Sequence, residues 1–271
     1  MGLILAAAIQ MNSQPDLDAN MADVERFVGN AADRGASFVA LPENFAFLGD
    51  EKEKLRQAET IADAVMERIP ALVKKHGISI LAGGFPARAE PGKVYNRAVF
   101  FDSGNRSTST YDKIHLFDIH LSEEDSYRES DTVQPGLPDT VIHHSSHGIR
   151  FGLSICYDVR FPELYRRLAS QSAEVLCIPS AFTRPTGEAH WEVLLRARAI
   201  ENTCYVIAPA QTGLHGKTRK THGHTMIIDP WGNILHQLGT DTGMALAETD
   251  TSYIDSIRKK LPSLQHCRLN K

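Results

Sequence analysis

Short apolar runs alternate along the chain with segments whose apolar residues recur at helical spacing. Continuous runs of Val, Ile, Leu and Ala between amphipathic helices are typical of sheets that helices cover. The apolar runs lie near 3–10, 37–41, 78–83, 94–101, 149–155, 174–179 and 204–210. The helical patterns lie near 16–34, 51–76, 162–171 and 188–202. The pattern therefore predicts an α/β fold.

The last quarter of the chain is richer in strand patterns than the rest. Strands are predicted near 225–229, 234–237 and 243–249, and a final helix near 251–260. The sequence has no linker, internal repeat or low-complexity tract, which predicts one domain over 1–271. Residues 117–139 are polar and contain Pro135, Gly136 and Pro138. A loop of that length inside a compact domain is usually functional.

Composition and charge narrow the function classes. The 271 residues carry a formal net charge of −4, which gives no reason to expect nucleic acid or an anionic membrane as a partner. No apolar run reaches the roughly 18 residues that a membrane-spanning helix needs. The first residues, 1–9, lack the basic leader of a signal peptide, and Gln10 and Asn12 follow them. We expect this segment to be a buried first strand.

Three predicted strands each lead to one ionisable residue. Glu43 follows the run at 38–41, Lys113 follows 109–112, and Cys156 ends the run at 149–155. Taken singly, each has an ordinary interpretation: a helix-start carboxylate, an exposed lysine and a buried cysteine. Together they supply the base, the positive charge and the nucleophile of an amide hydrolase.

The chemistry requires these residue types. A free thiol has a pKa of about 8.5, and only the thiolate is a strong nucleophile, so a base such as Glu43 must take the proton of Cys156. Attack on an amide carbonyl produces an oxyanion, for which Lys113 supplies charge and the backbone N–H of Tyr157 a second donor. The scheme needs no metal and no cofactor.

The contexts of these residues carry a family resemblance. The motifs LPENF around Glu43, YDKIHLFD around Lys113 and ICYDVRFPEL around Cys156 occur in this order. The chain resembles the nitrilase superfamily of carbon–nitrogen hydrolases from Ile4 to about Gln265. The resemblance implies a four-layer α-β-β-α sandwich and a homodimer or higher homo-oligomer that extends the sandwich.

The resemblance also implies a second carboxylate in the polar loop. Glu129 matches the auxiliary glutamate of the superfamily, which orients the lysine and the substrate. An ordinary loop acid remains the alternative. The neighbouring candidates are Glu123, Glu124, Asp125 and Asp131.

Within the superfamily the chain is most similar to the deaminated glutathione amidases, chiefly over 179–232. This implies hydrolysis of deaminated glutathione to 2-oxoglutarate and cysteinylglycine, a metabolite-repair reaction. An ω-amidase acting on 2-oxoglutaramate, or an enzyme for another small amide or N-carbamoyl compound, is the first alternative. The ω-amidases tend to carry GAFN where this chain has SAFT at 180–183, and RAVDN where it has RAIEN at 198–202. Nitrilases usually carry Trp-Glu after the cysteine, where this chain has Tyr157 and Asp158. A catalytically idle scaffold that binds a partner protein is the alternative of another class.

Besides Tyr157, three residues near the nucleophile are candidates for substrate binding. Arg160 follows Cys156 by four residues, and a guanidinium suits the carboxylate of an α-keto acid. Its alternative is an ion pair with Glu163 or Asp158. Phe182 and Thr186 follow the strand near 174–179 and offer an apolar face and a hydroxyl. For Phe182 the alternative is core packing.

The other cysteines do not form a metal or redox motif. Cys177 and Cys204 lie inside apolar runs and are expected to be buried structural thiols, and Cys267 lies in a polar tail. A reactive thiolate is best kept in a reducing compartment, which predicts a cytoplasmic location.

The helix near 188–202 and the histidine groups are expected to be structural. Arg198 and Glu201 stand at i,i+3 and are predicted to pair as scaffold or dimer-interface residues. Two histidine groups lack convincing carboxylate or cysteine partners, so no metal site is predicted. They are His143-His144-x-x-His147 and His222-x-His224.

Overall fold

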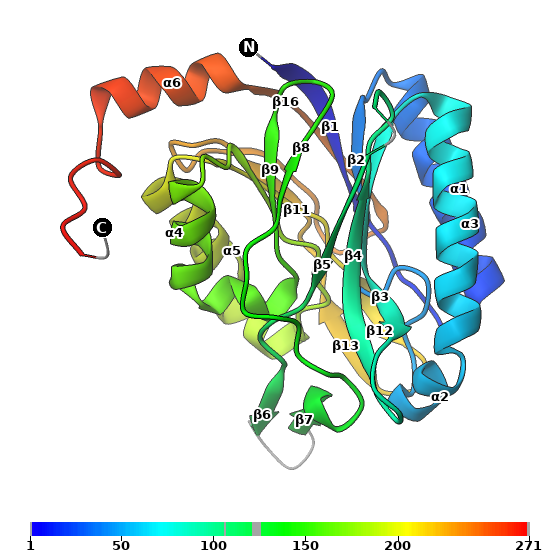
Figure 1. Ribbon diagram of the computed structural model, residues 1–271. Helices are drawn as coiled ribbons and strands as arrows, with labels where there is room; N and C mark the ends of the chain where they lie inside the picture. Colours follow the sequence, from blue (N-terminus) through cyan, green and yellow to red (C-terminus); the bar gives the residue numbers. More distant parts are fainter. Residues whose placement is uncertain (1, 106, 121–125, 270–271) are drawn as a thin grey trace.

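Two six-stranded sheets pack face to face between two layers of helices (Figure 1). The computed structural model describes residues 2–105, 107–120 and 126–269. Helices α1 (Leu17–Asp33) and α3 (Ala58–His76) cover one sheet, and α4 (Pro162–Ser170) and α5 (Arg184–Asn202) cover the other. The predicted α-β-β-α sandwich is therefore confirmed.

The first sheet has three parallel strands at its centre. Strands β1 and β3 both pair in parallel with β2, so that Ala6 and Ser79 flank Phe38. The remaining strands pair in antiparallel fashion. The order is β16 (Gly243–Asp250), β1 (Leu3–Gln10), β2 (Phe38–Ala40), β3 (Ser79–Arg88), β4 (Val94–Phe101) and β5 (Thr108–Asp112).

The second sheet repeats this plan. Strands β9, β10 and β11 run parallel, with Val175 between Phe151 and Tyr205, and the outer strands are antiparallel. The order is β15 (Ile234–Gln237), β14 (Met226–Ile228), β11 (Tyr205–Ala208), β10 (Val175–Cys177), β9 (Arg150–Leu153) and β8 (Ile142–His144). Because parallel strands end at the same edge of a sheet, polar residues that follow them meet there.

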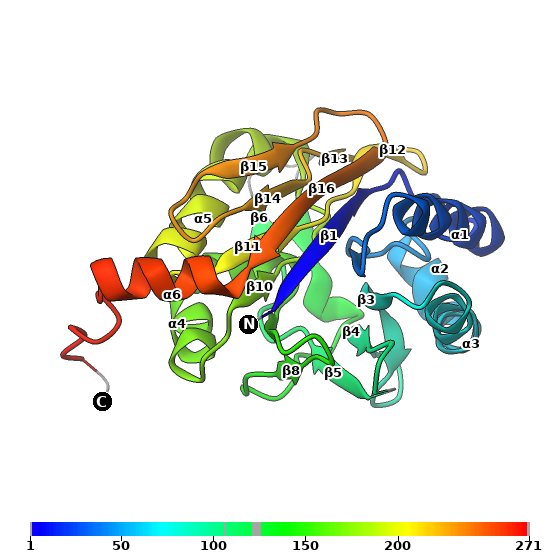
Figure 2. The same ribbon diagram turned by 90° about the horizontal axis from the view of Figure 1, so that it is seen from above.

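Helix α6 (Thr251–Lys260) follows the edge strand β16 and projects from the body of the molecule (Figure 2). The same view places β16 beside β1, in agreement with their antiparallel pairing. The side chain of Asp250 caps the helix by accepting a hydrogen bond from the N–H of Ser252 at 2.8 Å. This helix begins and ends where the sequence pattern predicts.

Several boundaries differ from the sequence prediction. The helix expected over 51–76 is two helices, α2 (Glu51–Arg56) and α3, separated at Gln57. Helix α5 begins at Arg184 and not near 188, because proline is well accommodated in the first turn of a helix and Pro185 lies there.

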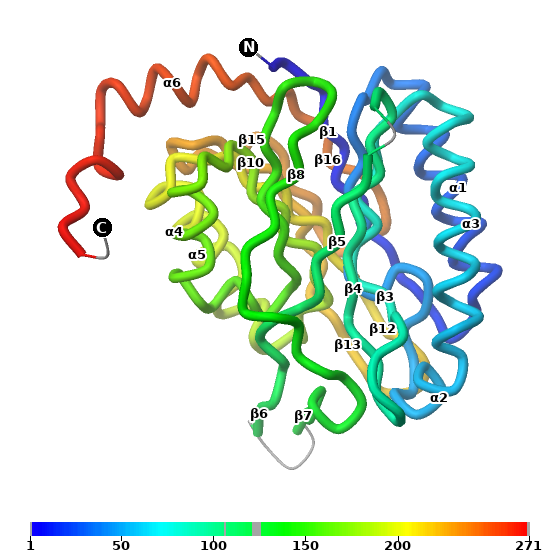
Figure 3. Tube along the Cα trace, viewed as in Figure 1, coloured from blue at the N-terminus to red at the C-terminus, as the bar shows by residue number. Residues whose placement is uncertain are grey.

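The segment 117–139 is also more regular than a loop. It holds a small hairpin of β6 (Asp118–His120) and β7 (Ser126–Arg128), followed by the 3-10 helix η1 (Glu129–Asp131). A second hairpin, β12 (Thr212–His215) and β13 (Arg219–His222), was not predicted. Both hairpins and α2 gather at the lower end of the molecule in Figure 3. These segments surround the candidate site.

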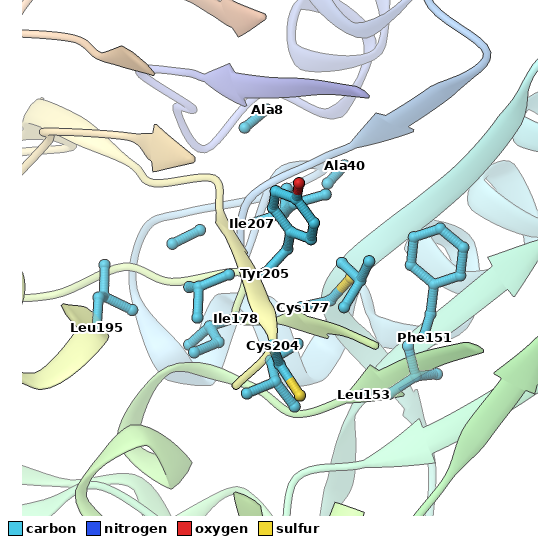
Figure 4. Packing of buried hydrophobic residues seen from close by; sticks show 14 of the residues in the cluster. Ala8, Ala40, Phe151, Leu153, Cys177, Ile178, Leu195, Cys204, Tyr205 and Ile207 are labelled. Atoms are coloured by element: carbon cyan, nitrogen blue, oxygen red, sulfur yellow. The ribbon is translucent and has the colours of Figure 1, made fainter. Parts of the chain in front are cut away.

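The core is built from the apolar runs and the helix faces that cover them. One cluster lies between the first sheet and α1 and α3, and a larger one fills the space between the sheets and beneath α4 and α5. Figure 4 shows Cys177 and Cys204 among Phe151, Leu195 and Ile207 in the larger cluster. Both cysteines are fully buried, as their apolar surroundings in the sequence predict.

Candidate active site

Cys156 lies in a sharp turn that follows the parallel strand β9. The strand ends at Leu153, and Cys156 begins the 3-10 helix η2 (Cys156–Arg160). Its φ of 50° falls in the left-handed region, which is uncommon for a residue with a Cβ atom. The N–H of Cys156 donates to the carbonyl oxygen of Pro179 at 2.9 Å. The strained turn holds the thiol at the carboxyl edge of the second sheet, where strain often marks a functional residue.

Glu43 reaches the same place from the first sheet. It follows β2, and the next residue, Asn44, also has a positive φ, 59°. The N–H of Asn44 donates to the carbonyl oxygen of Gly84 at 2.6 Å. A Cβ atom on Gly84 would lie 2.1 Å from Oδ1 of Asn96, so this close approach requires glycine.

The Glu43 carboxylate is fixed by hydrogen bonds at both oxygens. Its Oε2 accepts from the N–H of Ala181 at 2.9 Å, and its Oε1 accepts from Nδ2 of Asn96 at 2.8 Å. The ammonium of Lys113 lies 3.0 Å from Oε1. A buried carboxylate with this set of donors is held in one orientation.

Lys113 is enclosed between two carboxylates. Besides Glu43, its Nζ contacts Oε2 of Glu129 at 2.8 Å and Oε1 at 3.0 Å. Glu129 also accepts from Nδ2 of Asn96 at 3.1 Å and from the N–H of Phe117 at 2.6 Å. Lys113 is 1% exposed, so this ion pair is shielded from water. The structure thus brings together the four residues predicted to act in catalysis.

Electrostatics keep the lysine charged. Burial disfavours its charged form, but the carboxylates of Glu129 and Glu43 outweigh that effect, and the pKa of Lys113 is raised well above its ordinary value. Burial likewise raises the pKa of Glu129, but the charge of Lys113 outweighs it, so that pKa is lowered. The result is a protonated lysine paired with an ionised Glu129, with the Glu43 carboxylate 3.0 Å away on its other side.

The thiol is held in its neutral form. Burial is the main cause that raises the pKa of Cys156, and the negative charge of Glu43 raises it further. The charge of Lys113 and the N–H of Ala181 act in the opposite direction but do not cancel this shift. A neutral thiol beside a carboxylate needs proton transfer to become a nucleophile. Glu43 is the neighbouring carboxylate that can take the proton.

Of the rival acids of the polar loop, Asp131 is the one within the described residues, and it does not occupy this position. Asp131 is exposed and lies 3.6 Å from Nε of Arg128. Glu123, Glu124 and Asp125 lie outside the described residues.

A pocket opens over the thiol. Three of the predicted substrate-binding residues, Tyr157, Phe182 and Thr186, line it together with Cys156, Glu43, Lys113 and Glu129. Phe182 also packs on Trp191, with ring centroids 4.9 Å apart, so its core-packing role and its place in the pocket coexist.

Arg160 lies beside the pocket and not in its lining. Its guanidinium carbon is 5.6 Å from the ring centroid of Tyr157 and 5.4 Å from that of Phe182. Its Nη1 and Nη2 atoms each lie 3.3 Å from Nδ1 of His190. The guanidinium therefore rests on two rings that line the pocket. Within the described residues it forms no ion pair with Glu163 or with Asp158, which instead contacts His115.

Sequence reasoning missed several residues of the pocket. Asn96 holds both glutamates, and its signal was a polar residue inside the apolar run 94–101. Lys54 and Arg219 also line the pocket. Lys54 lies in the segment predicted as one long helix, and no element was predicted around Arg219, so nothing in the sequence pattern placed either residue near the thiol.

The remaining candidates have structural roles. Arg198 is buried, and it contacts Glu201 at 2.7 Å and the carbonyl oxygen of Val159 at 2.9 Å, which makes it scaffold. His143 lies between Asp102 and Ser109, at 3.2 Å and 2.9 Å. Burial raises the pKa of Cys204 to about 11.

The described residues contain neither a metal-binding cluster nor a helix that could span a membrane. Within 2–105, 107–120 and 126–269, no group of three or more His, Cys, Asp or Glu side chains is arranged to hold a metal ion. No helix in these described ranges is both long and apolar enough to cross a membrane.

Comparison with known proteins places this arrangement in a family. The family model of carbon–nitrogen hydrolases matches residues 5–259. A deaminated glutathione amidase from Synechocystis sp. is 51% identical over 264 residues, which cover 97% of both chains. The deaminated glutathione amidase of Homo sapiens is 40% identical, over 98% of this chain and 83% of the human protein.

Solved structures share the fold. The crystal structure of the Caenorhabditis elegans NitFhit protein has a TM-score of 0.93 and 39% identity, and the match covers 99% of this chain and 66% of that one. Saccharomyces cerevisiae Nit3, a member of branch 10 of the nitrilase superfamily, has a TM-score of 0.86 and 28% identity, with 96% and 95% covered. This chain belongs to the carbon–nitrogen hydrolase family of the nitrilase superfamily.

Proposed function

We propose that this chain is a cysteine-dependent amidase that hydrolyses deaminated glutathione to 2-oxoglutarate and cysteinylglycine. The observation that carries the proposal is the thiol of Cys156 in a pocket with Glu43, Lys113 and Glu129. The substrate assignment is supported by relatives of that name at 51% and 40% identity. Both sheets supply residues to this pocket, so we infer that 1–271 acts as a single catalytic domain.

The reaction begins with proton transfer from the thiol of Cys156 to the carboxylate of Glu43 as sulfur attacks the amide carbonyl carbon. The ammonium of Lys113 and the N–H of Tyr157 stabilise the oxyanion that forms. When the carbon–nitrogen bond breaks, Glu43 gives the proton to the leaving nitrogen, and a thioester remains on sulfur.

Water completes the cycle. Glu43 takes a proton from the water molecule that attacks the thioester, and the second oxyanion is stabilised by the same two donors. Collapse releases 2-oxoglutarate and a thiolate, which regains the proton from Glu43. In both halves Glu129 positions Lys113 and balances its charge, as their contact at 2.8 Å supports.

Three side chains select the acyl group in this proposal. Phe182 and Thr186 line the pocket and offer an apolar face and a hydroxyl to the 2-oxoglutaryl chain. Arg160, whose guanidinium rests on the rings of Tyr157 and Phe182 beside the pocket, supplies positive charge for the carboxylate of the 2-oxoglutaryl chain. This role requires the guanidinium to leave His190, which it contacts at 3.3 Å.

A substrate comparison tests the proposal. On one preparation, kcat/KM is measured for deaminated glutathione, 2-oxoglutaramate, an N-carbamoyl amino acid and a nitrile. The proposal predicts the largest value for deaminated glutathione. A ratio to 2-oxoglutaramate at or below one would assign an ω-amidase instead, and absence of turnover on every compound would favour a partner-binding scaffold.

We further infer that the enzyme is a homodimer or higher homo-oligomer and acts in the cytoplasm. Val193 and Ile200, seven residues apart on α5, are 70% and 46% exposed, and Trp231 is 55% exposed. Val193 and Ile200 expose apolar surface on one face of α5, and such exposed apolar surface favours self-association. Its Cys156 nucleophile is best preserved in a reducing compartment. Sedimentation velocity with Val193→Lys as the variant tests the assembly.

A further inference from the structure

A second cluster of charges lines the pocket apart from the catalytic residues. Its members are Glu51 and Lys54 on α2 and Arg219 on β13. The Nζ atom of Lys54 lies 2.6 Å from Oε2 of Glu51, and Nη1 of Arg219 lies 3.3 Å from Oε1 of the same residue. Two cations therefore share one carboxylate, which leaves an excess positive charge at this wall.

This excess charge is withdrawn from bulk water. Lys54 is only 6% exposed, an unusual position for a lysine. The Nε atom of Arg219 is buried and has no hydrogen-bond partner in the part of the chain that the structure describes. Burial raises the pKa of Glu51, but Lys54 and Arg219 outweigh it and lower that pKa, so the carboxylate stays ionised between them. A buried wall with surplus cationic donors is suited to an anionic ligand.

The cluster lies on the same side of the pocket as Glu43 and Glu129. Lys54 Nζ is 3.4 Å from Oδ1 of Asn44, the residue next to Glu43 in the chain. Glu51 and Glu129 are close enough that the charge of Glu129 acts on the ionisation of Glu51. Arg219 reaches the hairpin that precedes Glu129, with its guanidinium carbon 5.8 Å from the ring centroid of Tyr127.

The direction of the substrate follows from the proton that Glu43 must return. The leaving nitrogen has to face Glu43, so the part of the substrate beyond that nitrogen extends toward the neighbouring wall. In deaminated glutathione this part is Cys-Gly, which ends in a carboxylate. Two extended residues span at most about 7 Å, which takes the carboxylate past the glutamates and toward α2.

We infer that Lys54 and Arg219 bind the terminal carboxylate of the leaving Cys-Gly group. This inference rests on the proposed function and adds the residues that separate a dipeptide-bearing substrate from a simple primary amide. Glu51 acts as a positioning residue, because it holds both cations toward the pocket. The acyl group lies on the other side of the thiol, beside Phe182 and Thr186.

The test compares substrates that differ only in the leaving group. Lys54→Met and Arg219→Gln are assayed with deaminated glutathione and with 2-oxoglutaramate, which lacks Cys-Gly. Loss of a hydrogen bond to a charged group should lower kcat/KM for deaminated glutathione by about ten- to a hundredfold more than for 2-oxoglutaramate. Lys52→Met and Lys220→Gln, exposed neighbours on the same elements, are matched controls and should keep the wild-type ratio.

A second arm needs no variant. Deaminated glutathione with its glycine carboxylate converted to an amide should lose about ten- to a hundredfold in kcat/KM with the wild-type enzyme. With Arg219→Gln, conversion of the glycine carboxylate to an amide should change kcat/KM only slightly.

Each result decides between outcomes. Equal losses on deaminated glutathione and 2-oxoglutaramate in the variants, or an amide derivative as good as the acid, would overturn the inference. Failure of the proposed function looks different, because the wild-type enzyme would then prefer 2-oxoglutaramate or turn over neither compound.

Discussion

Asp158 Oδ1 lies 2.7 Å from Nδ1 of His115 and joins the turn of the nucleophile to the segment that follows the catalytic lysine. The same oxygen accepts from the backbone N–H of His115 at 3.1 Å. Its other oxygen accepts from the hydroxyl of Tyr111 at 2.7 Å and from the N–H of Ile155 at 2.9 Å. Asp158 is fully buried, so these bonds fix the position of Cys156 relative to Lys113, although the two residues follow strands of different sheets.

Asp158→Asn should therefore reduce both stability and turnover. An amide nitrogen would face donors where a carboxylate oxygen now accepts, and each unsatisfied buried donor costs about 1–3 kcal/mol. Urea unfolding and kcat on the same preparation measure the two effects. Glu163→Gln, at an exposed position in α4, serves as the control. An unfolding free energy unchanged in Asp158→Asn would contradict the role of this network.

Cys156→Ser should abolish turnover, because a hydroxyl is a far poorer nucleophile than sulfur beside a carboxylate base. Cys177→Ser is the matched control, since Cys177 is buried in the core away from the pocket and its rate per folded molecule should be largely retained. Product release and circular dichroism are measured together. Ordinary activity in Cys156→Ser would mean that sulfur does not attack the amide.

Glu43→Gln should separate thiol acidity from catalysis. Loss of the negative charge lowers the pKa of Cys156, so iodoacetamide should alkylate this cysteine faster at a given pH. Amide hydrolysis should nevertheless fall by about 10²- to 10⁴-fold, because proton transfer is lost. Slower alkylation together with unchanged hydrolysis would show that Glu43 does not act on the thiol.

Glu129→Gln should lower the free energy of unfolding in a pH-dependent way. The folded protein holds the pKa of Glu129 below its ordinary value of 4.5. The contribution of the ionised carboxylate to the free energy of unfolding is therefore fully present above that pH. It is lost as pH falls below 4.5 and the folded group takes up its proton. Breaking a buried pair typically costs about 3–5 kcal/mol, which is the difference expected at pH 7.

Denaturant unfolding of the wild type and Glu129→Gln at pH 7 and at pH 4 measures this linkage. The difference in free energy of unfolding between the wild type and Glu129→Gln should be smaller at pH 4 than at pH 7. Glu67→Gln, at an exposed position on α3, should show no such gap. A gap that widens as pH falls would mean that Glu129 is not ionised in the folded state.

The sequence pattern predicted those parts of the fold whose signal is local. Strand β1 and helix α6 lie where apolar runs and helical spacing placed them, because burial decides both the pattern and the structure. The β12–β13 hairpin was missed because its burial pattern is mixed and its residues are mostly polar. The position of this hairpin depends on strand pairing and on packing against residues distant in the sequence, which a short stretch of sequence does not encode.

The same distinction holds for the site. Glu43, Lys113 and Cys156 each follow a strand, so the sequence suggested that they meet at sheet edges. Arg219 reaches the pocket through a contact with Glu51, from which it is 168 residues distant in the chain, and Lys54 enters the pocket from the same short helix α2 as Glu51. Only the three-dimensional structure places them beside the substrate.

The central claim is that Cys156 is acylated by the 2-oxoglutaryl part of deaminated glutathione. The direct measurement is rapid acid quenching during turnover, followed by mass spectrometry of the tryptic peptide 151–160, which contains Cys156 and no other cysteine. The account predicts a 2-oxoglutaryl group on Cys156 that appears within the first turnover and disappears when substrate is exhausted. Turnover without that modified peptide, or an acyl group on another residue, would contradict it.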